Sequence, residues 1–366
     1  MKQYYYFFTN GKLRRKDRSL FFLFGEQENS EPDESQFPLE NSLVIKSQTD
    51  VNQNSSEDDS DKNNKMHIPI ETVESIFCFS EITFTRAVLS FLGKLNVPVF
   101  IYDYYGNYCG TYYPKCEVIS GERLLNQVRH HLDAKLRLEI AREVVCASIK
   151  NMDSTLTYYE NREIELKSEI EQIKKMYEDA ESSTGIKRLM GAEGYARHNY
   201  YDAWKKILAD KNFDGRNSNP PLDPINAIIS FLYSLLYNIC TNECYRIGLN
   251  PAISYVHELG ENRNSLALDI ADIFKPIISD RVAFSLLNKG QINEAEHTRS
   301  EAGGVYLNET GIKIVARKFD EKLRSTFYHR ELKRHISHRQ LIQHEVYKLL
   351  AHISGEKPLK CFRAWW

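Results

Sequence analysis

The stretch NPPLDPINAIISFLYSLLYNICTNECYRIGLNP, residues 219–251, decides how the larger part of this 366-residue chain folds. It opens with prolines, which the first turn of a helix accepts because the amides there have no partner inside the helix. The residues that follow are apolar on almost every side, and a helix of that kind lies in a protein interior. The stretch therefore predicts a central helix surrounded by others.

Helical periodicity also extends along the sequence that precedes this helix. One apolar face is expected to include Leu125, Val128, Leu132, Leu136, Ile140, Val144 and Val145. The charged segment at residues 161–183 carries a narrow apolar stripe and is predicted as one arm of a helical hairpin. Residues 119–366 are therefore predicted to form a larger, all-α domain.

Residues 1–118 predict a small β-rich domain, which makes the fold class α+β. QYYYFFTNGKLRRKDRSLFFLFG, residues 3–25, has aromatic runs around an Asn-Gly pair, a strong hairpin signal. VPVFIYDYYGNYCGTYYP, residues 97–114, predicts two strands joined by a turn, and a short helix is expected just before it. Residues 25–65 carry eleven acids against three lysines. We expect this acidic segment to be a disordered insertion, in which SLVIK could add a short strand.

Composition indicates a soluble, cytoplasmic protein. Seven cysteines without a CxxC pair argue against a disulfide framework and a zinc ribbon, and Cys240 and Cys244 are interpreted as packing residues. No eighteen-residue apolar run and no signal peptide are found, so no membrane contact is expected. A P-loop, GxSxG and GxGxxG are all absent.

The polar residues in PAISYVHELGENRNSLALDIADIFKP, residues 251–276, are candidates for chemistry. Asp269 and Asp272 lie three apart on one helix face among apolar neighbours, where two like charges resist desolvation unless something offsets them. Glu193 lies between Gly191 and Gly194, which suggests close approach of another backbone or a ligand. With His257, these acids form a nitrogen and oxygen set suited to manganese, magnesium or zinc. The alternative is a helix boundary with solvated charges.

The other histidines lack matching acids nearby and are interpreted as surface or DNA-facing residues: His130, His131, His335, His338 and His344. From residue 298 to 339 there are ten lysines and arginines against five acids. This basic segment is either a solvated helical surface or a phosphate-binding face. The aromatic end, KPLKCFRAWW, could fold back or dock a partner.

Taken together, motifs along almost the whole chain resemble the CRISPR-associated spacer-acquisition integrases, the Cas one family. The matching motifs are IPIETVESIFCF, VPVFIYDYYGNYCGTYYP, GAEGYARHNYYDAW, PPLDPINAIISFLYSLLYN, GLNPAISYVHE, NSLALDIADIFKPIISDR and GGVYLNETGIKIVARKFDEKL. The acidic insertion is longer than expected for that family. After Asp272, Phe274 and Lys275 stand where the family often has an acid and an arginine.

The resemblance implies a metal held by Glu193, His257 and Asp272, with Asp269 as the accompanying acid and manganese or magnesium as the cofactor. It implies insertion of short foreign DNA into a CRISPR array, by attack of a DNA 3′-hydroxyl on a repeat phosphodiester. The implied partners are double-stranded DNA, a second copy in a homodimer and a bridging Cas two dimer, with a Cas four nuclease as a further candidate. Candidate DNA contacts are Lys187, Arg188, Arg197, Arg317 and Arg324. Two alternatives remain: a metal-dependent nuclease on branched DNA, and a non-catalytic DNA-binding scaffold.

Overall fold

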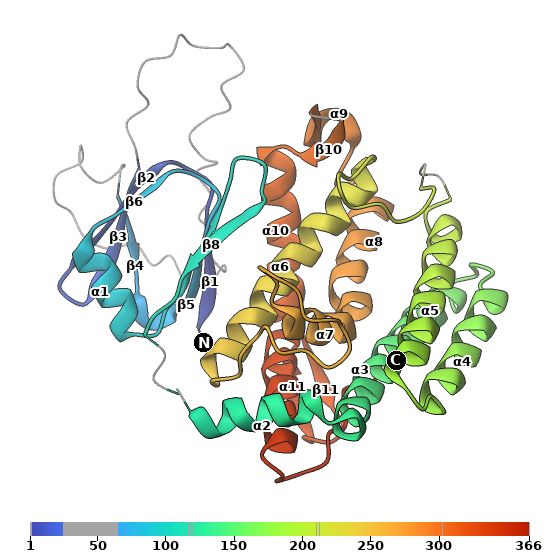
Figure 1. The fold of residues 1–366 in the computed structure, drawn as a ribbon. Helices are drawn as coiled ribbons and strands as arrows, with labels where there is room; N and C mark the ends of the chain where they lie inside the picture. The colour runs from blue at the N-terminus through green and yellow to red at the C-terminus, as the bar shows by residue number, and fades with distance from the viewer. Residues whose placement is uncertain are drawn as a thin grey trace. The chain divides into compact units, whose positions relative to one another are not determined.

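The computed structural model describes residues 2–24, 65–115, 118, 120–209, 211, 213–301 and 303–365. The chain divides into two compact units, Met1–Glu117 and Val118–Trp366. Most of the acidic segment, including SLVIK, lies outside the described residues. A strand-rich part followed by a larger helical part confirms the predicted α+β fold class (Figure 1).

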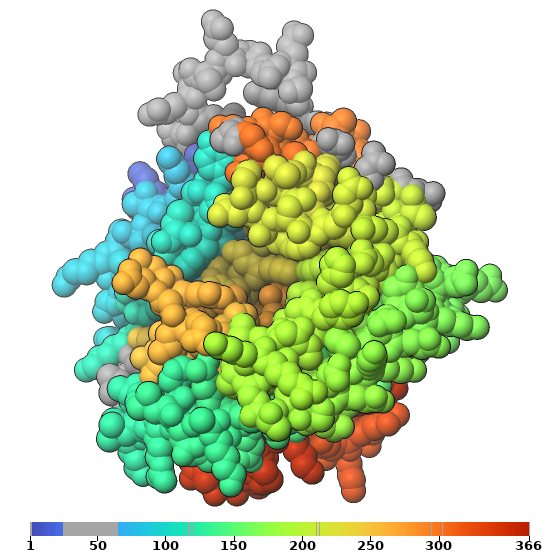
Figure 2. Space-filling view, turned by 45° about the vertical axis from the view of Figure 1, so that its right-hand side comes forward, coloured from blue at the N-terminus to red at the C-terminus, as the bar shows by residue number. Residues whose placement is uncertain are grey.

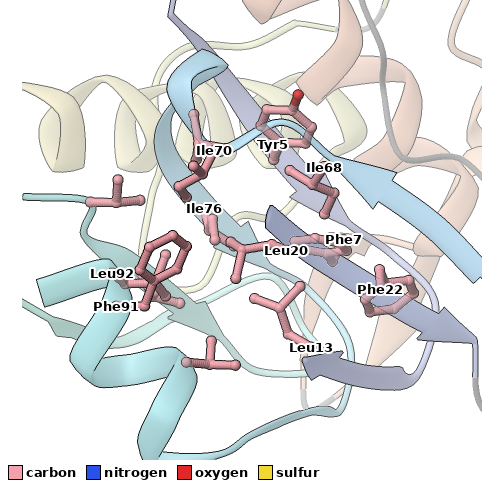
Figure 3. Close-up of a cluster of buried hydrophobic side chains, with 14 of the residues drawn as sticks. Tyr5, Phe7, Leu13, Leu20, Phe22, Ile68, Ile70, Ile76, Phe91 and Leu92 are labelled. Atoms are coloured by element: carbon pink, nitrogen blue, oxygen red, sulfur yellow. The ribbon is translucent and has the colours of Figure 1, made fainter. Parts of the chain in front are cut away.

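The first unit contains two four-stranded sheets. The first sheet follows the order β1 (Gln3–Phe7), β5 (Val73–Cys78), β7 (Val99–Tyr102) and β8 (Tyr108–Tyr112). The second follows the order β4 (Lys65–Ile68), β3 (Ser19–Phe24), β2 (Gly11–Lys16) and β6 (Ile82–Phe84). The described residues of this unit also form a short 3-10 turn, η2 (Ile70–Thr72), and a helix, α1 (Arg86–Lys94). Apolar side chains from both sheets and from α1 meet in one buried core (Figure 3).

The hairpin predicted at Asn10-Gly11 is wrong, because β1 and β2 belong to different sheets. The N–H of Gly11 donates to the carbonyl of Glu81 at 3.0 Å, and the Asn10 side chain accepts from the N–H of Glu81 at 3.0 Å. Gly11 is required because a Cβ there would lie 2.4 Å from the carbonyl oxygen of Leu23. The true hairpin joins β2 to β3 at Asp17, whose φ is 53°.

The second unit is mostly helical. Its helices before the site are α2 (Gly121–Leu132), α3 (Ala134–Glu160), α4 (Lys167–Glu181), α5 (Ile186–Ile207) and α6 (Pro224–Arg246). Then come α7 (Ser265–Phe274), the π-helical η3 (Lys275–Ser279), α8 (Asp280–Asn288), α9 (Glu294–His297), α10 (Glu309–Arg324) and α11 (His338–Ile353). Two antiparallel pairs interrupt the helices, which an all-α prediction missed: β9 (Thr298–Glu301) with β10 (Gly304–Leu307), and β11 (Thr326–His329) with β12 (Arg334–Ser337).

The predicted central helix is α6. It begins where the Asp223 side chain accepts the N–H of Asn226 at 2.8 Å, with Pro224 in its first turn. Within the described ranges it is the one helix long and apolar enough to cross a membrane, but 72% of its apolar window is buried inside the protein. Cys240 and Cys244 are fully buried on it, which confirms their interpretation as packing residues.

The predicted apolar face before α6 is only partly correct. Asp133 ends α2 and caps α3 by accepting the N–H groups of Lys135 and Leu136. In α3, Ile140 is buried as expected, whereas in α2 Leu125 and Leu132 remain 71% and 76% exposed. Helix α2 is therefore not attached to the second unit by its leucines.

Candidate functional site

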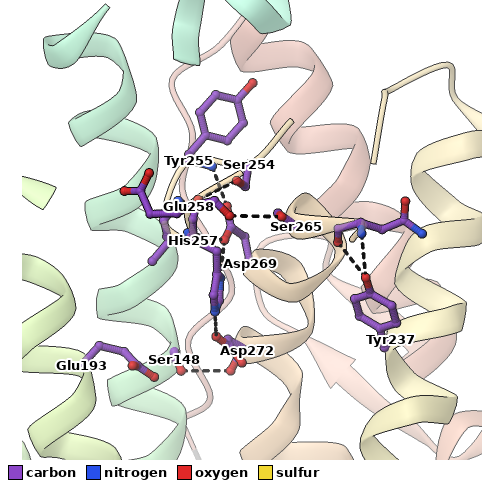
Figure 4. A network of polar contacts seen from close by, with 12 residues as sticks. Ser148, Glu193, Tyr237, Ser254, Tyr255, His257, Glu258, Ser265, Asp269 and Asp272 are labelled. Carbon is purple, nitrogen blue, oxygen red and sulfur yellow. Dashed lines mark hydrogen bonds and ion pairs between the residues drawn. The ribbon is translucent and has the colours of Figure 1, made fainter. Parts of the chain in front are cut away.

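The candidate residues come from three neighbouring segments of the second unit. Glu193 lies on α5, His257 lies on the loop between α6 and α7, and Asp269 and Asp272 lie on α7. Helix α7 packs against both α3 and α6, so Asp269 and Asp272 project from a helix that two other helices hold in place. Figure 4 shows His257 between Asp269 and Asp272, with Glu193 approaching from α5.

Asp269 fixes the backbone around His257. Its carboxylate is almost fully buried and accepts the N–H groups of Tyr255 at 2.7 Å, Val256 at 3.0 Å and His257 at 3.1 Å. It also contacts Nδ1 of His257 at 2.7 Å. Because a carboxylate can only accept, Nδ1 carries the proton and donates it, which leaves the lone pair of Nε2 free. Asp269 therefore orients the imidazole.

Asp272 lies on the opposite side of the same imidazole. Its Oδ2 is 3.8 Å from Nε2 of His257, while its Oδ1 is 2.5 Å from Nζ of Lys275 and 3.6 Å from Nη2 of Arg197. Burial raises the pKa of this carboxyl group, but the neighbouring Lys275, Arg197 and His257 outweigh it and hold the pKa at about 2. Asp272 is thus ionised and faces the ring nitrogen that Asp269 leaves free.

Glu193 reaches this group through Arg197, one helical turn further along α5. The Arg197 guanidinium is 2.6 Å from Oε1 of Glu193, and its Nη2 is 3.4 Å from Oγ of Ser148. Oγ of Ser148 donates to the backbone carbonyl of Asp272 at 2.9 Å. Arg197, a candidate DNA contact from sequence, therefore lies between two of the candidate acids.

Lys275 is positioned by a break in helical geometry. Helix α7 changes at Lys275 into the π-helical turn η3, and π-helical turns are frequent at functional sites. The Nζ of Lys275 lies 4.8 Å from the centre of the Tyr233 ring. The Tyr233 hydroxyl in turn donates to Asp280 at 2.8 Å, as the Tyr200 hydroxyl does at 3.0 Å.

The pKa of His257 is shifted upwards. Burial lowers the pKa, but the hydrogen bond to Asp269 and the charge of Asp272 outweigh burial and raise it above its ordinary value. The imidazole is therefore more basic than a free histidine, which suits a ligand whose other nitrogen donates to a carboxylate.

The donor types fit a divalent cation. The set comprises an imidazole nitrogen and two carboxylates, and a Cβ added at Gly191 or Gly194, beside Glu193, would meet nothing within 4 Å. The expected close approach of another backbone at these glycines is therefore wrong, and both glycines lie on an exposed surface of α5. In the part of the chain that the structure describes, no three His, Cys, Asp or Glu side chains close around a single point. Lys275 and Arg197 contact the carboxylates instead.

The elements that carry the candidate residues border a recess in the surface of the helical unit (Figure 2). Figure 2 shows a recess between the yellow-green surface of α5 and the light-orange residues that follow α6, with darker yellow and orange chain at its floor. These colours correspond to the elements that carry Glu193, His257 and Asp272. The arrangement can therefore present two acids, an imidazole and two cations to a ligand from outside.

The proposed DNA contacts have different surroundings. Lys187, Arg188 and Arg317 are exposed. Arg324 is paired with the buried Asp320 at 2.8 Å, so its charge is already compensated within the protein. His338, interpreted as a surface or DNA-facing residue, is buried, and burial lowers its pKa to about 3. The surface interpretation of His338 is wrong.

Sequence reasoning missed several residues around the site: Gln127, Ser148, Tyr233 and Asp280. Asp280 and Tyr233 sit in apolar helical sequence, where a buried polar side chain signals a network, but their partners are distant in the chain. Ser148 gives no local signal. Lys275 stood out only as a departure from a family pattern.

Comparison with known proteins gives full-length matches. A family model described as CRISPR associated protein Cas1 matches residues 40–321. A CRISPR-associated endonuclease Cas1 of Fusobacterium nucleatum is 34% identical over 367 residues, which covers 100% of this chain and 98% of the relative. A CRISPR-associated endonuclease Cas1 of Thermodesulfovibrio yellowstonii is 35% identical over 368 residues, with both chains fully covered.

Solved structures share the fold. A Cas1 protein from Thermotoga maritima matches with a TM-score of 0.77 and 29% identity, with both chains fully covered. A casposase bound to an integration product matches with a TM-score of 0.79 and 19% identity, over 99% of this chain and 93% of the casposase. A chain of a Cas6-RT-Cas1–Cas2 complex matches with a TM-score of 0.74 and 16% identity, over 100% of this chain and 36% of its own.

Proposed function

Since the chain belongs to the Cas1 family of CRISPR-associated proteins, we propose that it is a metal-dependent integrase of CRISPR adaptation whose centre also cleaves DNA. In this role it inserts short foreign DNA, the protospacer, into the CRISPR array. The observation that carries the proposal is the alignment of Asp269, His257 and Asp272, in which a free imidazole nitrogen faces an ionised carboxylate.

The proposed reaction exchanges one phosphodiester bond for another. The 3′-oxygen of the incoming strand forms a bond to the phosphorus at the repeat boundary, and the bond from that phosphorus to the 3′-oxygen of the repeat strand breaks. The proton of the attacking hydroxyl is lost and the departing oxygen gains one. No covalent bond to the protein is needed. With water as the nucleophile, the same exchange becomes cleavage.

We assign the ligands of the proposed manganese or magnesium ion to Glu193, His257 and Asp272. When bound, such an ion stabilises negative charge on phosphate oxygens and favours ionisation of the attacking hydroxyl. Asp269 is assigned to positioning, because its oxygens already accept three N–H groups and the imidazole proton. Lys275 and Arg197, which lie against Asp272, can turn their donors towards the phosphate oxygens.

The proposed partners are double-stranded DNA, a second copy of the chain, a bridging Cas2 dimer and, for trimming incoming ends, a Cas four nuclease. Exposed Lys187, Arg188 and Arg317 would contact phosphates without reading sequence. The proposed place of action is the cytoplasm. Its reducing conditions suit the free cysteines of the described chain.

Strand transfer provides the test. The protein, with and without Cas2, is incubated with a short 3′-hydroxyl duplex and a supercoiled plasmid that carries a repeat, in manganese, magnesium or EDTA. Parallel reactions use Asp272→Asn, His257→Ala and a duplex with 3′-deoxy ends. Glu261→Gln is the matched control, because Glu261 lies on the same loop and is exposed.

Integration predicts joined products that need metal and a 3′-hydroxyl, that disappear in both site variants and that persist in the control. Cleavage without joining, even with Cas2 present, would favour a general nuclease acting on branched DNA. Metal-independent DNA binding with no product of either kind would favour a scaffold.

A further inference from the structure

The loop that carries His257 is held from a second side, by α2. Of the residues of α2, Gln127 is the buried one. Its Nε2 donates to the carbonyls of Asn250 at 2.8 Å and Ile253 at 3.4 Å, and its Oε1 accepts the N–H of Asn250 at 2.9 Å. A single amide side chain thus satisfies both backbone groups of Asn250 and one group closer to the site.

Neighbouring side chains continue this contact towards His257. Nδ1 of His131, one turn after Gln127, lies 2.6 Å from the carbonyl of Ser254, and a carbonyl can only accept. Oγ of Ser254 donates to the carbonyl of His257 at 2.7 Å. At the start of α3, Nε of Arg137 donates to the carbonyl of Tyr255 at 2.9 Å. Three donors therefore bind carbonyls along residues 250–255.

The two sides of the loop are held by complementary groups. Asp269 accepts the N–H groups of residues 255–257, whereas Gln127, His131 and Arg137 bind carbonyls of residues 250, 253, 254 and 255. The Asp269 carboxylate belongs to α7, whereas the donors belong to α2 and to the start of α3. The position of the imidazole consequently depends on both.

The attachment of α2 is polar rather than apolar. Leu124, Leu125 and Leu132 are 42%, 71% and 76% exposed, while Gln127 is fully buried. A third hydrogen-bonding side chain, Arg123, donates to the carbonyl of Ile247 at 2.9 Å. Since a buried amide is costly unless it is fully hydrogen-bonded, Gln127 fixes the register of the loop against α2 more strictly than leucine packing would.

We propose that Gln127 is a positioning residue for His257, acting through the 250–257 loop from α2, as Asp269 does from α7. Its effect on catalysis rests on the proposed integrase function, whereas its effect on the loop does not. Helix α2 is the first helix after the end of the first unit at residue 117, so the loop is fastened to the start of the helical unit as well as to α7.

The decisive variant is Gln127→Met, which keeps the length of the side chain and removes its three hydrogen bonds. Leu125→Ala is the matched control on the exposed side of the same helix. Two measurements are made on the full chain. Amide hydrogen exchange is followed by mass spectrometry over residues 250–258 without metal, and the rate of joining is followed at saturating DNA, with the DNA Kd measured separately in EDTA.

Gln127→Met is expected to speed exchange over residues 250–258 at least tenfold, to leave exchange of α3 to α6 unchanged, and to leave the DNA Kd unchanged. The joining rate is expected to fall about 10- to 100-fold, as for other residues that orient a metal-binding histidine. Leu125→Ala is expected to change neither measurement. Unchanged exchange in the loop, or an equal increase throughout the helical unit, would overturn the proposal.

A second variant covers the case in which Gln127→Met does not fold. His131→Leu removes the donor to Ser254 from a half-buried position and should loosen the same loop. Unchanged loop exchange in this variant would also count against the proposal. If the wild-type protein joins no DNA, the integrase function fails, while hydrogen exchange still decides the role of Gln127.

Discussion

The carboxylate of Asp269, which is buried inside the helical unit, accepts a hydrogen bond from Nδ1–H of His257 at 2.7 Å. This hydrogen bond selects the neutral tautomer that carries its proton on Nδ1, so Nε2, which faces Asp272, has the free lone pair. We therefore predict that Asp269→Asn reduces joining and cleavage by about 10- to 100-fold. The single oxygen of an amide cannot accept both the Nδ1–H of His257 and the three backbone N–H groups that now bind the two carboxylate oxygens. Initial rates in manganese test this. Circular dichroism distinguishes a site defect from unfolding, and Glu261→Gln on the same loop should retain near wild-type rates.

Asp280 predicts a pH-dependent stability. Burial raises its pKa to about 7, although hydrogen bonds from Tyr233 and Tyr200 lower it. Its contribution to the free energy of unfolding is therefore fully present below the unfolded value of 3.8 and is lost as pH rises through 7, by at most about 4 kcal/mol. Asp280→Asn should become more stable relative to wild type between pH 5 and pH 8.

Urea unfolding of both proteins at these two pH values measures the effect. Asp214→Asn, at an exposed position of the helical unit, serves as the control and should show the same difference from wild type at both values. A difference between wild type and Asp280→Asn that does not change with pH would show that Asp280 remains ionised in the folded protein.

The C-terminal segment is predicted to be necessary for stability. The buried side chain of Asn151 donates to the carbonyls of Ile273 at 2.7 Å and Phe362 at 3.2 Å, and accepts the N–H of Ala364 at 2.7 Å. The described part of the tail thus folds back onto the helical unit. Ending the chain after Lys360 should cost roughly 2–5 kcal/mol of unfolding free energy, because buried polar groups lose their partners. Ending it after Ala364 keeps those hydrogen bonds and should cost clearly less in thermal unfolding.

Two arginines on α10 should separate DNA binding from stability. Arg317 is exposed, so Arg317→Ala should weaken DNA binding similarly for all sequences and reduce the slope of log K against log salt by about one unit. Thermal stability should be unchanged. Fluorescence anisotropy at several salt concentrations gives both the affinity and the slope, and an unchanged slope would exclude Arg317 from the contact surface.

Arg324→Ala is predicted to act mainly on stability. Arg324 pairs with Asp320, which is buried and whose pKa burial raises to about 6. Without its partner this carboxyl group stays buried, which should cost about 1–3 kcal/mol of unfolding free energy. A normal thermal midpoint with strongly weakened DNA binding would instead assign Arg324 to the DNA surface.

The sequence was most informative where local pattern and burial agree. The apolar character of α6 predicted its central place, and the turn between β7 and β8 was predicted from its tyrosines and Gly106, whose φ is 78°. The Asn10-Gly11 pair was misleading because the same dipeptide that closes a hairpin also serves where the chain crosses between two sheets. Only the partner strands decide between these uses, and β1 pairs with β5, about seventy residues away.

For the candidate site, the sequence spacing predicted that the two aspartates lie close together, but it did not predict their separate roles. Asp269 and Asp272 were correctly expected on one stretch of helix, but their different tasks depend on a loop that begins before the helix and returns across it. The polar side of α2 was also unpredictable from pattern, because a helix with leucines at regular spacing normally buries them. In α2, the buried Gln127 makes the contact with the protein that buried leucines normally make.

The pairing of β3 with β4 determines how much the length of the chain between them matters for folding. Leu23 stands opposite Lys65 in an antiparallel register, so the chain leaves the sheet after residue 24 and returns beside its point of departure. Closing such a loop costs only about 0.6 kcal/mol more for each doubling of its length. Changing the length of the chain between the two strands should therefore alter the free energy of folding only slightly, as long as residues 20–23 keep their pairing with Lys65–Ile68.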